Sequence, residues 1–424
     1  MIFSLDVRRA RKGDCLLVHY GSKADPGLVL IDGGPSQVYN PHLKPRLAEI
    51  RKARGLGSDE SLVVDLAMVS HIDDDHINGI LELMRELIAS LDAQEPLPLK
   101  LRSFWHNSFD DIIGNNSKEL VAAVRASFGA ASLNGEPDTE GLDPAAARVL
   151  ASVAQGFNLR DDIKKLNDKL NSQFRLNSEF KGNLVMTQKA PINLGKGLKL
   201  TVIGPMKKEL LALQKEHDAF LKKQARNKKT KAATAAFTDE SAANLSSLVL
   251  LAEVNKKRIL LTGDARGDKV IEGLELLGLL KKDGKSKIHV DILKMPHHGS
   301  DRNVDPVFFR RITADHYVFS GDGEHGNPER ETLQMLLDEN GKADFTIHMT
   351  YPIDEIDAGR KADWETEQRK EKQRGKEKVR ENWSPKKHSL KAFFAANKEF
   401  AKKLSIIGGH GDPHVINLFD KIGF

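Results

Sequence analysis

Residues 63–91 read VVDLAMVSHIDDDHINGILELMRELIASL, and this stretch decides how the rest of the chain is interpreted. Its first eight residues form an apolar run of strand length that ends at Ser70. Its last part, from Ile80 onward, places apolar side chains at the spacing of one helix face. Two histidines and three aspartates stand between these parts, within six positions. The stretch therefore predicts a buried strand, a polar loop and a helix.

The polar loop has the composition of a metal site. Carboxylates at this density repel one another, and a divalent cation compensates because it favours ionised Asp and neutral His. In the spacing H-x-D-x-D-H, alternate loop residues point the same way, so His71, Asp73 and Asp75 can converge while His76 turns toward a second centre. Two metals fit this pattern better than one. Alternatively, the aspartates cap the following helix, which would explain them but neither histidine.

Three later predicted strands also end in polar clusters. Asp264 follows the apolar run RILL in RILLTGD, which alone is ordinary turn chemistry. His297 and His298 follow the strand VDILKM. Adjacent histidines there are more informative because imidazole is the commonest metal ligand, although a surface pair is the alternative. The Gly-rich loop SGDGEHGNP follows a further strand and carries Asp322, Glu324 and His325.

Length and composition restrict the class of protein. The 424 residues fit two domains or one large decorated domain, and 40% hydrophobic with 29% charged residues is typical of a globular chain. The single cysteine, Cys15, excludes an intramolecular disulfide and a cysteine-based zinc site. No apolar run reaches the roughly 18 residues of a membrane span, so no membrane association is predicted. No secretory signal is recognisable, and we expect a cytoplasmic protein.

The net charge of +5 hides two strongly basic segments. Residues 359–403 hold 15 Lys and Arg against 7 Asp and Glu, and residues 207–231 hold 9 against 3. Both segments read as helices with exposed charged faces, which requires no partner. The more specific hypothesis is that these segments bind a polyanion, because Lys and Arg gain affinity by releasing counterions from phosphates. Trp364, Trp383, Phe393 and Phe394 would stack on bases if exposed, or would pack a helical hairpin.

In chain order, the motifs DVRRARKGDCLLVHYG, LVLIDGGP, SHIDDDHINGI, LLTGDA, LKMPHHGS and FSGDGEHGNP resemble the metallo-β-lactamase fold. They are most similar to its branch in the hydrolase domain of ComEC-type DNA-uptake proteins. The superfamily's first motif is H-x-H-x-D-H, and Asp73 replaces its second histidine, as in that branch. The resemblance covers residues 1–110 and 190–335. It implies an α+β, four-layer αββα sandwich.

The resemblance also implies a domain organisation. A hydrolase domain would occupy residues 1–345, with helical insertions near 115–185 and 206–235. A basic helical segment and a closing strand, residues 346–424, would pack on this core.

The resemblance further implies two divalent metal ions per chain, Zn or Mn. Their ligands would be histidines and aspartates of the motifs: His71, Asp73, Asp75, His76, His106, Asp264 and His298. His71 and Asp73 would share one ion with a histidine that ends the next strand, and Asp264 would bridge the two ions. His106 occupies that strand end, although a histidine that caps a core-forming strand fits equally. Asp75 and His76 would hold the second ion together with one histidine of the pair His297 and His298.

Paired cations lower the pKa of a bridging water and stabilise oxyanions, which suits hydrolysis of phosphate esters and acyl bonds. Asp75, or alternatively Asp73, would orient the water as a base. The non-ligating member of the pair His297 and His298, with His297 the preferred assignment, would donate a proton to the leaving oxygen. The residues expected to contact substrate are Ser300, His325 and Asn327. We therefore expect a metal-dependent hydrolase, a phosphodiesterase or nuclease whose basic insertions bind nucleic acid. The alternatives are hydrolysis of a small phosphodiester, lactone or thioester, or a defence or DNA-uptake accessory that acts through a protein partner.

Overall fold

The structure is a computed structural model that describes most of the chain. It covers residues 1–108, 112, 144–171, 174, 176–212, 215, 246–376, 378–407 and 414–424. Most of the predicted insertion at 206–235, and a large part of that at 115–185, lie outside these residues. Strands and helices are mixed along the described chain, so the prediction that it combines both is confirmed.

The first sheet is built mainly from the N-terminal third of the chain. Its strands are β1 (Ile2–Val7), β2 (Leu16–Gly21), β3 (Pro26–Ile31), β5 (Leu66–Met68), β7 (Phe104–Trp105) and β16 (His414–Asn417). They lie in the order β16-β1-β2-β3-β5-β7. The pairs from β16 to β3 are antiparallel, whereas β3, β5 and β7 run parallel.

The second sheet holds the later strands. They are β8 (Ile192–Gly195), β9 (Leu198–Gly204), β10 (Val249–Val254), β11 (Lys257–Leu261), β12 (Ile288–Lys294), β13 (Ile312–Phe319), β14 (Thr346–Met349) and β15 (Leu404–Ile406). They lie in the order β15-β14-β13-β12-β11-β10-β9-β8, with β11 to β15 parallel. A small separate pair joins β4 (Leu62–Val64) to β6 (Leu99–Leu101).

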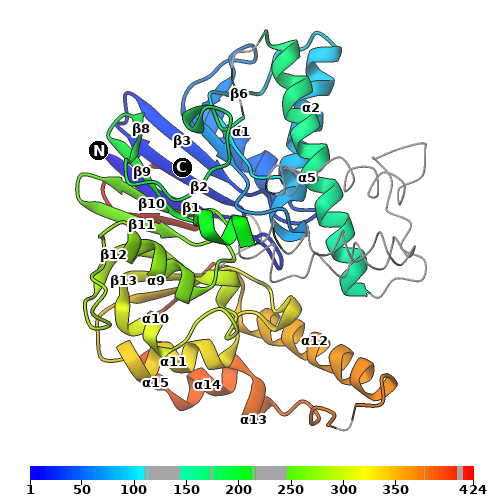
Figure 1. Cartoon of the computed structure of the whole chain (residues 1–424), viewed down its shortest axis with the longest axis vertical. Helices are drawn as coiled ribbons and strands as arrows, with labels where there is room; N and C mark the ends of the chain where they lie inside the picture. Colours follow the sequence, from blue (N-terminus) through cyan, green and yellow to red (C-terminus); the bar gives the residue numbers. More distant parts are fainter. Residues whose placement is uncertain are drawn as a thin grey trace.

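Helices cover the outer face of each sheet. On the first sheet these are α1 (Lys44–Ala53), α2 (Asp74–Asp92) and α5 (Pro144–Lys169), which share one apolar cluster with its strands. On the second sheet they are α9 (Gly267–Leu276), α10 (Pro306–Arg311), α11 (Arg330–Asn340), α14 (Leu390–Ala396) and α15 (Lys398–Ala401). The inner faces meet in a third cluster, which includes Leu5 and Val18 from one sheet and Leu250 and Ile292 from the other. The layer order is helix, sheet, sheet, helix (Figure 1).

Residues after 345 add to both sheets. β15 extends the second sheet beside β14, and β16 extends the first beside β1. In the sequence, α12 (Ile353–Gln373) and α13 (Pro385–His388) stand between β14 and β15, and α12 runs away from the sheets (Figure 1). Among the described helices, none combines the length and apolar composition that crossing a membrane requires.

The topology places several loops at one edge of the two sheets. β5, β11, β12 and β13 each pair in parallel with a neighbouring strand, and the carboxyl ends of parallel strands meet at the same edge. The loops that follow them carry the four polar clusters of the sequence. One detail differs from expectation: α2 begins at Asp74, not near Ile80. Acidic residues are favourable in the first turn of a helix, so Asp74 and Asp75 extend it toward the strand.

Candidate metal centre

Close backbone approaches bring the loops together. A Cβ atom on Gly13, in the β1–β2 turn, would lie 1.8 Å from the carbonyl oxygen of Asp75. The amide of Asp14 donates a hydrogen bond to that same oxygen at 3.2 Å. Gly33 and Gly79 make a similar contact, because a Cβ on Gly79 would lie 2.0 Å from the carbonyl oxygen of Gly33. Glycine at these positions lets the start of α2 sit directly against the turns after β1 and β3.

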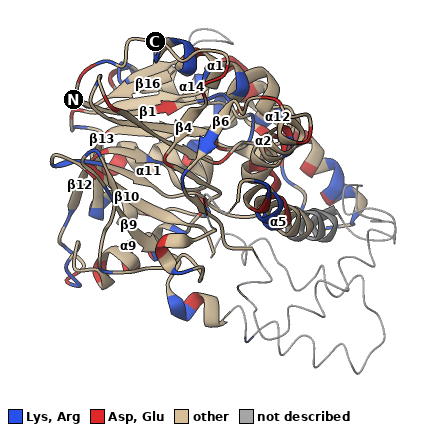
Figure 2. Ribbon diagram, turned by 90° about the horizontal axis from the view of Figure 1, so that it is seen from above, with Lys and Arg blue, Asp and Glu red and all other residues tan. Residues whose placement is uncertain are grey.

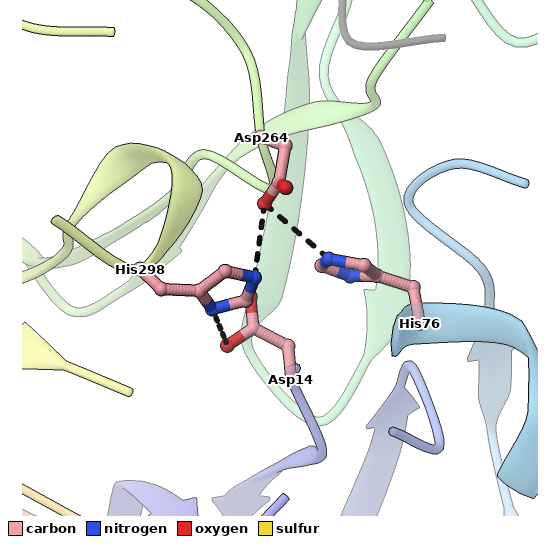
Figure 3. A group of neighbouring side chains, drawn as sticks. All are labelled: Asp14, His76, Asp264 and His298. Atoms are coloured by element: carbon pink, nitrogen blue, oxygen red, sulfur yellow. Dashed lines mark ion pairs between the residues drawn. The ribbon is translucent and has the colours of Figure 1, made fainter. Parts of the chain in front are cut away.

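The carboxylate of Asp264 lies at the centre of the cluster, between imidazoles (Figure 3). Its Oδ1 is 3.3 Å from His76 Nε2 and 3.5 Å from His298 Nε2. Its Oδ2 is 3.7 Å from His71 Nε2 and 3.4 Å from His297 Nε2. Each oxygen of one carboxylate therefore faces a different pair of histidines.

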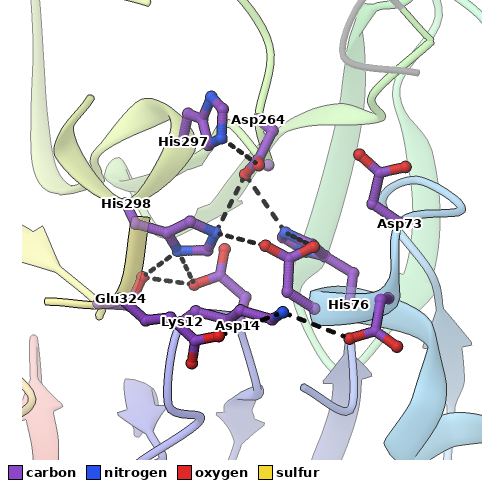
Figure 4. Close-up of polar contacts among 12 residues, drawn as sticks. Lys12, Asp14, Asp73, His76, Asp264, His297, His298 and Glu324 are labelled. Carbon is purple, nitrogen blue, oxygen red and sulfur yellow. Dashed lines mark hydrogen bonds and ion pairs between the residues drawn. The ribbon is translucent and has the colours of Figure 1, made fainter. Parts of the chain in front are cut away.

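The cluster thus has two halves, one around each oxygen of Asp264. The carboxylates of Asp73 and Asp75 each approach the imidazoles of one half (Figure 4). Asp73 Oδ2 is 3.6 Å from His71 Nε2, on the side of Asp264 Oδ2. Asp75 approaches the other pair, with Oδ1 3.9 Å from His76 Nε2 and Oδ2 3.6 Å from His298 Nε2. The sequence left open which of the adjacent histidines would join Asp75 and His76, and the geometry puts His298 there. The other half contains His71, Asp73 and His297.

Hydrogen bonds hold all four imidazoles in one orientation, through Nδ1. The Nδ1 partners are Ser70 Oγ for His71 (3.1 Å), Asp32 Oδ2 for His76 (2.8 Å), Asn303 Oδ1 for His297 (2.8 Å) and Ser320 Oγ for His298 (2.9 Å). Carboxylate and amide oxygens only accept, and both serine hydroxyls donate to aspartates. Each Nδ1 is therefore the donor, and each neutral imidazole presents the lone pair of Nε2 to the centre. Metal-binding histidines are oriented in this way.

The atoms at the centre fit cations. His71 Nε2, His76 Nε2, His298 Nε2 and Asp264 Oδ1 are buried and have no hydrogen-bond partner within the described part of the chain. Leaving a buried polar atom unsatisfied costs about 1–3 kcal/mol, and several lone pairs converging on one another add repulsion. Divalent cations bound by nitrogen and oxygen would remove both costs, and this donor set suits zinc or manganese.

The electrostatics of the cluster also call for positive charge. Burial opposes a charge on His298, but the carboxylates of Asp264 and Asp14 outweigh it and raise the pKa to about 9. Burial likewise disfavours charged His76, whose pKa is nevertheless raised by Asp264, Asp32 and Asp75. Burial would raise the pKa of Asp264, yet the surrounding imidazoles lower it well below its usual range. Without a metal, the carboxylates therefore favour protonated His76 and His298, whereas burial and the neighbouring His76 lower the pKa of His71 to about 3 and favour its neutral form.

The backbone at three of these positions is strained. Asp32, His297 and His298 have φ of 57°, 47° and 55°, in the left-handed region that residues other than glycine rarely adopt. Such conformations cost of order 1 kcal/mol or more and persist where the surroundings enforce them. Both adjacent histidines thus point into the centre from one tight turn, the 3₁₀ segment Pro296–Gly299.

Sequence reasoning missed a second group of buried residues behind the ligands. Asp14 lies within 4.8 Å of His76, Asp264 and His298 through its ligand atoms, so it belongs to the same cluster. Its Oδ1 accepts from Ser320 Oγ at 2.6 Å, and its Oδ2 lies 2.5 Å from Nζ of the fully buried Lys294. Asp14, in RKGDC, and Asp32, in LIDGG, are single polar residues beside strands. That position is the signal that could have identified them.

His106 is buried at the end of β7, and its assignment as a ligand stays a prediction. Its backbone is fixed by Asn177, whose side chain bonds both the amide (3.0 Å) and the carbonyl (2.8 Å) of His106. A Cβ on Gly156 of α5 would lie 3.9 Å from His106 Nε2 and 3.1 Å from Ile72. The imidazole therefore sits between α5 and the loop that carries His71 and Asp73.

The residues predicted to contact substrate lie in the loops that follow β12 and β13. The amide of Ser300 donates to the carbonyl of His297 at 2.9 Å. Asn327 is buried, and a Cβ on Gly321 would meet its carbonyl oxygen at 3.2 Å and the Cβ of His298 at 3.6 Å. His325, which also has a positive φ of 61°, lines a cavity of about 670 Å³. Their role toward substrate stays a prediction.

Comparison with known proteins assigns no family. No protein-family model matches the chain. Part of the chain is similar to microtubule-associated protein 1A, with 42% identity over 59 residues to the rat and mouse proteins (Rattus norvegicus, Mus musculus) and 39% over 66 residues to the human protein (Homo sapiens). These segments span 14% to 15% of the chain and 2% of the relatives. A match of this extent shows neither a shared fold nor a shared activity.

Proposed function

We propose that the chain is a metal-dependent hydrolase of the metallo-β-lactamase fold, with a dinuclear centre that activates water. The observation that carries this proposal is the environment of Asp264, whose two carboxylate oxygens face different pairs of imidazole Nε2 atoms. That is the arrangement expected of a carboxylate that bridges two cations. The helix, sheet, sheet, helix order of layers supports the fold.

Bound in the two halves, the cations would supply an activated water and would polarise the oxygen of a substrate. The protein's own contribution is orientation and charge. The three-residue network of Asp14, Ser320 and Lys294 fixes His298, and Asp32 fixes His76. Asp75, 16% exposed, would accept the proton of the water.

His297 differs from the other three imidazoles in its access to solvent. Its side chain is 30% exposed, whereas those of His71, His76 and His298 are at most 1% exposed. Because His297 is the most exposed of the four imidazoles, it can reach a substrate and donate a proton to the leaving oxygen, although it also faces the same Asp264 oxygen as His71. A phosphodiester is the substrate class that such a centre and the basic helical segments favour, with nucleic acid as its polymeric form.

A second candidate substrate class follows from the cavity beside the centre. Its acidic lining residues are Asp322, Glu324, Glu355, Asp363 and Glu367. Lys370 is the one Lys or Arg among its lining residues. This surplus of carboxylates would repel a polyanion, whereas an uncharged lactone or thioester would fit. The cavity therefore favours a compact ester if the substrate occupies it.

The test is hydrolysis by the chelator-stripped protein before and after reloading with Zn or Mn. The substrates are bis-p-nitrophenyl phosphate, single-stranded DNA, a lactone and a thioester. Asp264→Asn should lower turnover of the preferred substrate by at least about a hundredfold, whereas Asp268→Asn, an exposed aspartate on the same segment, should leave it unchanged. Hydrolysis that survives both chelation and Asp264→Asn would refute the proposal. Capture of a protein partner equally by wild type and Asp264→Asn, without hydrolysis, would favour the accessory role.

A further inference from the structure

The segment that includes α12 forms an arm with its own internal structure. We call residues 353–388 the C-terminal arm; Figure 2 shows basic and acidic residues along α12. After the helix the chain folds back along it, because Gln368 Nε2 donates to the carbonyl of Arg380 at 2.9 Å and to Asn382 Oδ1 at 3.1 Å. Trp364 Nε1 donates to the carbonyl of Glu381 at 2.8 Å. The arm is therefore a hairpin held by side-chain to backbone hydrogen bonds.

Two tryptophans of the arm have different surroundings. Trp364 is half-buried: it stacks on His388 with ring centroids 4.3 Å apart and an interplanar angle of 29°, and the Arg380 guanidinium lies 5.1 Å from its ring centroid. Trp383 packs against Trp364 at 6.0 Å and against His388 at 5.2 Å, and the Arg360 guanidinium lies 5.8 Å from its ring centroid. It also lines a surface cavity of about 410 Å³. Its indole N–H makes no hydrogen bond to the described residues. Both indoles therefore belong to one cluster, and of the two it is Trp383 whose ring also lines the cavity and can contact a ligand there.

The other walls of this cavity are polar and, on balance, basic. Lys361, Glu365, Gln368, Arg369, Asn382 and Pro385 complete the lining. Lys361 pairs with Glu365 at 3.8 Å, whereas Arg369 has no carboxylate within ion-pair distance among the described residues and donates only to Thr366 Oγ1, at 2.9 Å. The cavity therefore combines an aromatic face, an amide and an uncompensated guanidinium.

We propose that this cavity binds one nucleotide unit of a single-stranded nucleic acid. Trp383 would stack on the base, the Asn382 amide would bond its edge, and Arg369 would pair with the phosphate. Stacking on an aromatic side chain is worth about 1–3 kcal/mol per base and tolerates any base. An acidic peptide would satisfy Arg369 but would leave the aromatic face unused, so the combination favours a nucleotide. The inference rests on the proposed function for its choice of nucleic acid as the partner, and it adds a binding site outside the metal centre.

The experiment measures binding without cleavage, in the full-length protein with chelator present. A fluorescently labelled thymidine oligonucleotide is compared with an abasic strand of the same length by anisotropy. Trp383→Leu should weaken binding of the thymidine strand about tenfold or more and leave the abasic strand unaffected. Arg369→Gln should weaken both strands and reduce the salt dependence of binding by about one phosphate contact. Lys398→Gln removes one positive charge outside the arm and should change neither.

The proposal fails if the wild type binds both strands equally and Trp383→Leu has no effect. It also fails if heparin, a polyanion without bases, competes as well as the thymidine strand for both the wild type and the variant. Absence of any binding by the wild type also overturns it. Unchanged metal uptake by Trp383→Leu confirms that the variant is folded. Because the centre is metal-free in the assay, lack of hydrolytic activity in the intact protein would count against the proposed function and not against this site.

Discussion

At the scale of single residues, the division of the centre into halves rests on two neighbouring aspartates. Asp73 lies 3.6 Å from His71, and Asp75 lies 3.6 Å from His298. Asp74, between them, instead faces Lys12 at 3.6 Å and accepts a hydrogen bond from Asn78. Three consecutive carboxylates therefore have three different environments, and only the outer two face the imidazoles.

This difference predicts the metal content of three matched variants. Asp73→Asn and Asp75→Asn should each retain about one tightly bound ion per chain after dialysis, because each removes a charged ligand from one half. Asp74→Asn should retain two. Elemental mass spectrometry of the dialysed proteins gives the count. Equal losses in all three variants would show that the loop acts only through its total charge.

Metal affinity should depend on pH through the imidazoles. In the metal-free protein the pKa of His298 is raised to about 9, since nearby carboxylates outweigh the effect of burial. Below about pH 9 a bound metal must displace this proton, so apparent affinity should fall as pH falls, by about tenfold per pH unit for each proton displaced. Calorimetric titrations in buffers of different ionisation enthalpy measure the proton release. A pH-independent affinity with no proton release would contradict the ligand role of His298.

Sequence patterns identified the residues that face the centre but not the buried residues, such as Asp14, that hold them in place. His71, Asp73, Asp75 and His76 are recognisable because they crowd one short loop. Asp14 is marked only by its place beside a strand, without such crowding, and its partner Ser320 is 306 positions away. Which imidazole faces which carboxylate oxygen is likewise a property of the assembled loops.

At the scale of elements, one buried charge cluster fastens α1 to β1. Arg46 Nε donates to Asp6 Oδ2 at 2.7 Å, and both side chains are almost completely buried. His19 Nε2 lies 3.4 Å from the same carboxylate oxygen. Burial would raise the pKa of Asp6, but the hydrogen bond from His19 and the charge of Arg46 outweigh it and lower the pKa to about 2.

Breaking this cluster should be costly. Asp6→Asn leaves the buried Arg46 with Glu49, which is 52% exposed, as its remaining carboxylate partner at 2.8 Å. The variant should lower the free energy of unfolding by about 3 kcal/mol, measured with a chemical denaturant. Because the pKa of Asp6 is depressed in the folded protein, the stabilisation is complete above the ordinary aspartate pKa of 3.8 and is lost as pH falls toward about 2. The variant should lack this acid-sensitive component. Asp268→Asn, at an exposed ion pair, should change stability by at most about 1 kcal/mol. Similar losses in both variants would contradict the account.

Strands were easier to predict than the boundaries of helices. The runs VVDLAMVS and VDILKM are short and β-rich, and β5 and β12 form there as expected. The start of α2 was misplaced because the aspartates that suit a metal loop also suit a first helical turn. The pairing of β16 with β1 joins residues more than 400 positions apart, which no local pattern records.

At the scale of the whole molecule, the centre lies where loops of the two sheets meet. His71 to His76, Asp14 and Asp32 come from the first sheet, whereas Asp264, His297 and His298 come from the second. A metal bound here would therefore link the two sheets, in addition to the apolar cluster between their inner faces.

Metal should consequently stabilise the fold as a whole. The thermal midpoint of the stripped protein should rise with added Mn²⁺ by an amount that follows the ratio of metal concentration to dissociation constant. Differential scanning calorimetry measures it. Asp264→Asn should show little of this rise, while Asp74→Asn should behave as the wild type. A rise of the same size in Asp264→Asn would mean that the ions stabilise the protein elsewhere.

The most direct test of a carboxylate-bridged pair is electron paramagnetic resonance of the stripped protein titrated with Mn²⁺. If Asp264 bridges two ions, the spectrum should develop the signal of a spin-coupled pair and saturate at about two ions per chain. Asp264→Asn should lose the coupled signal. A spectrum of isolated Mn²⁺ at every ratio of metal to protein would contradict the dinuclear centre. Failure of the stripped protein to bind either Mn²⁺ or Zn²⁺ would contradict it as well.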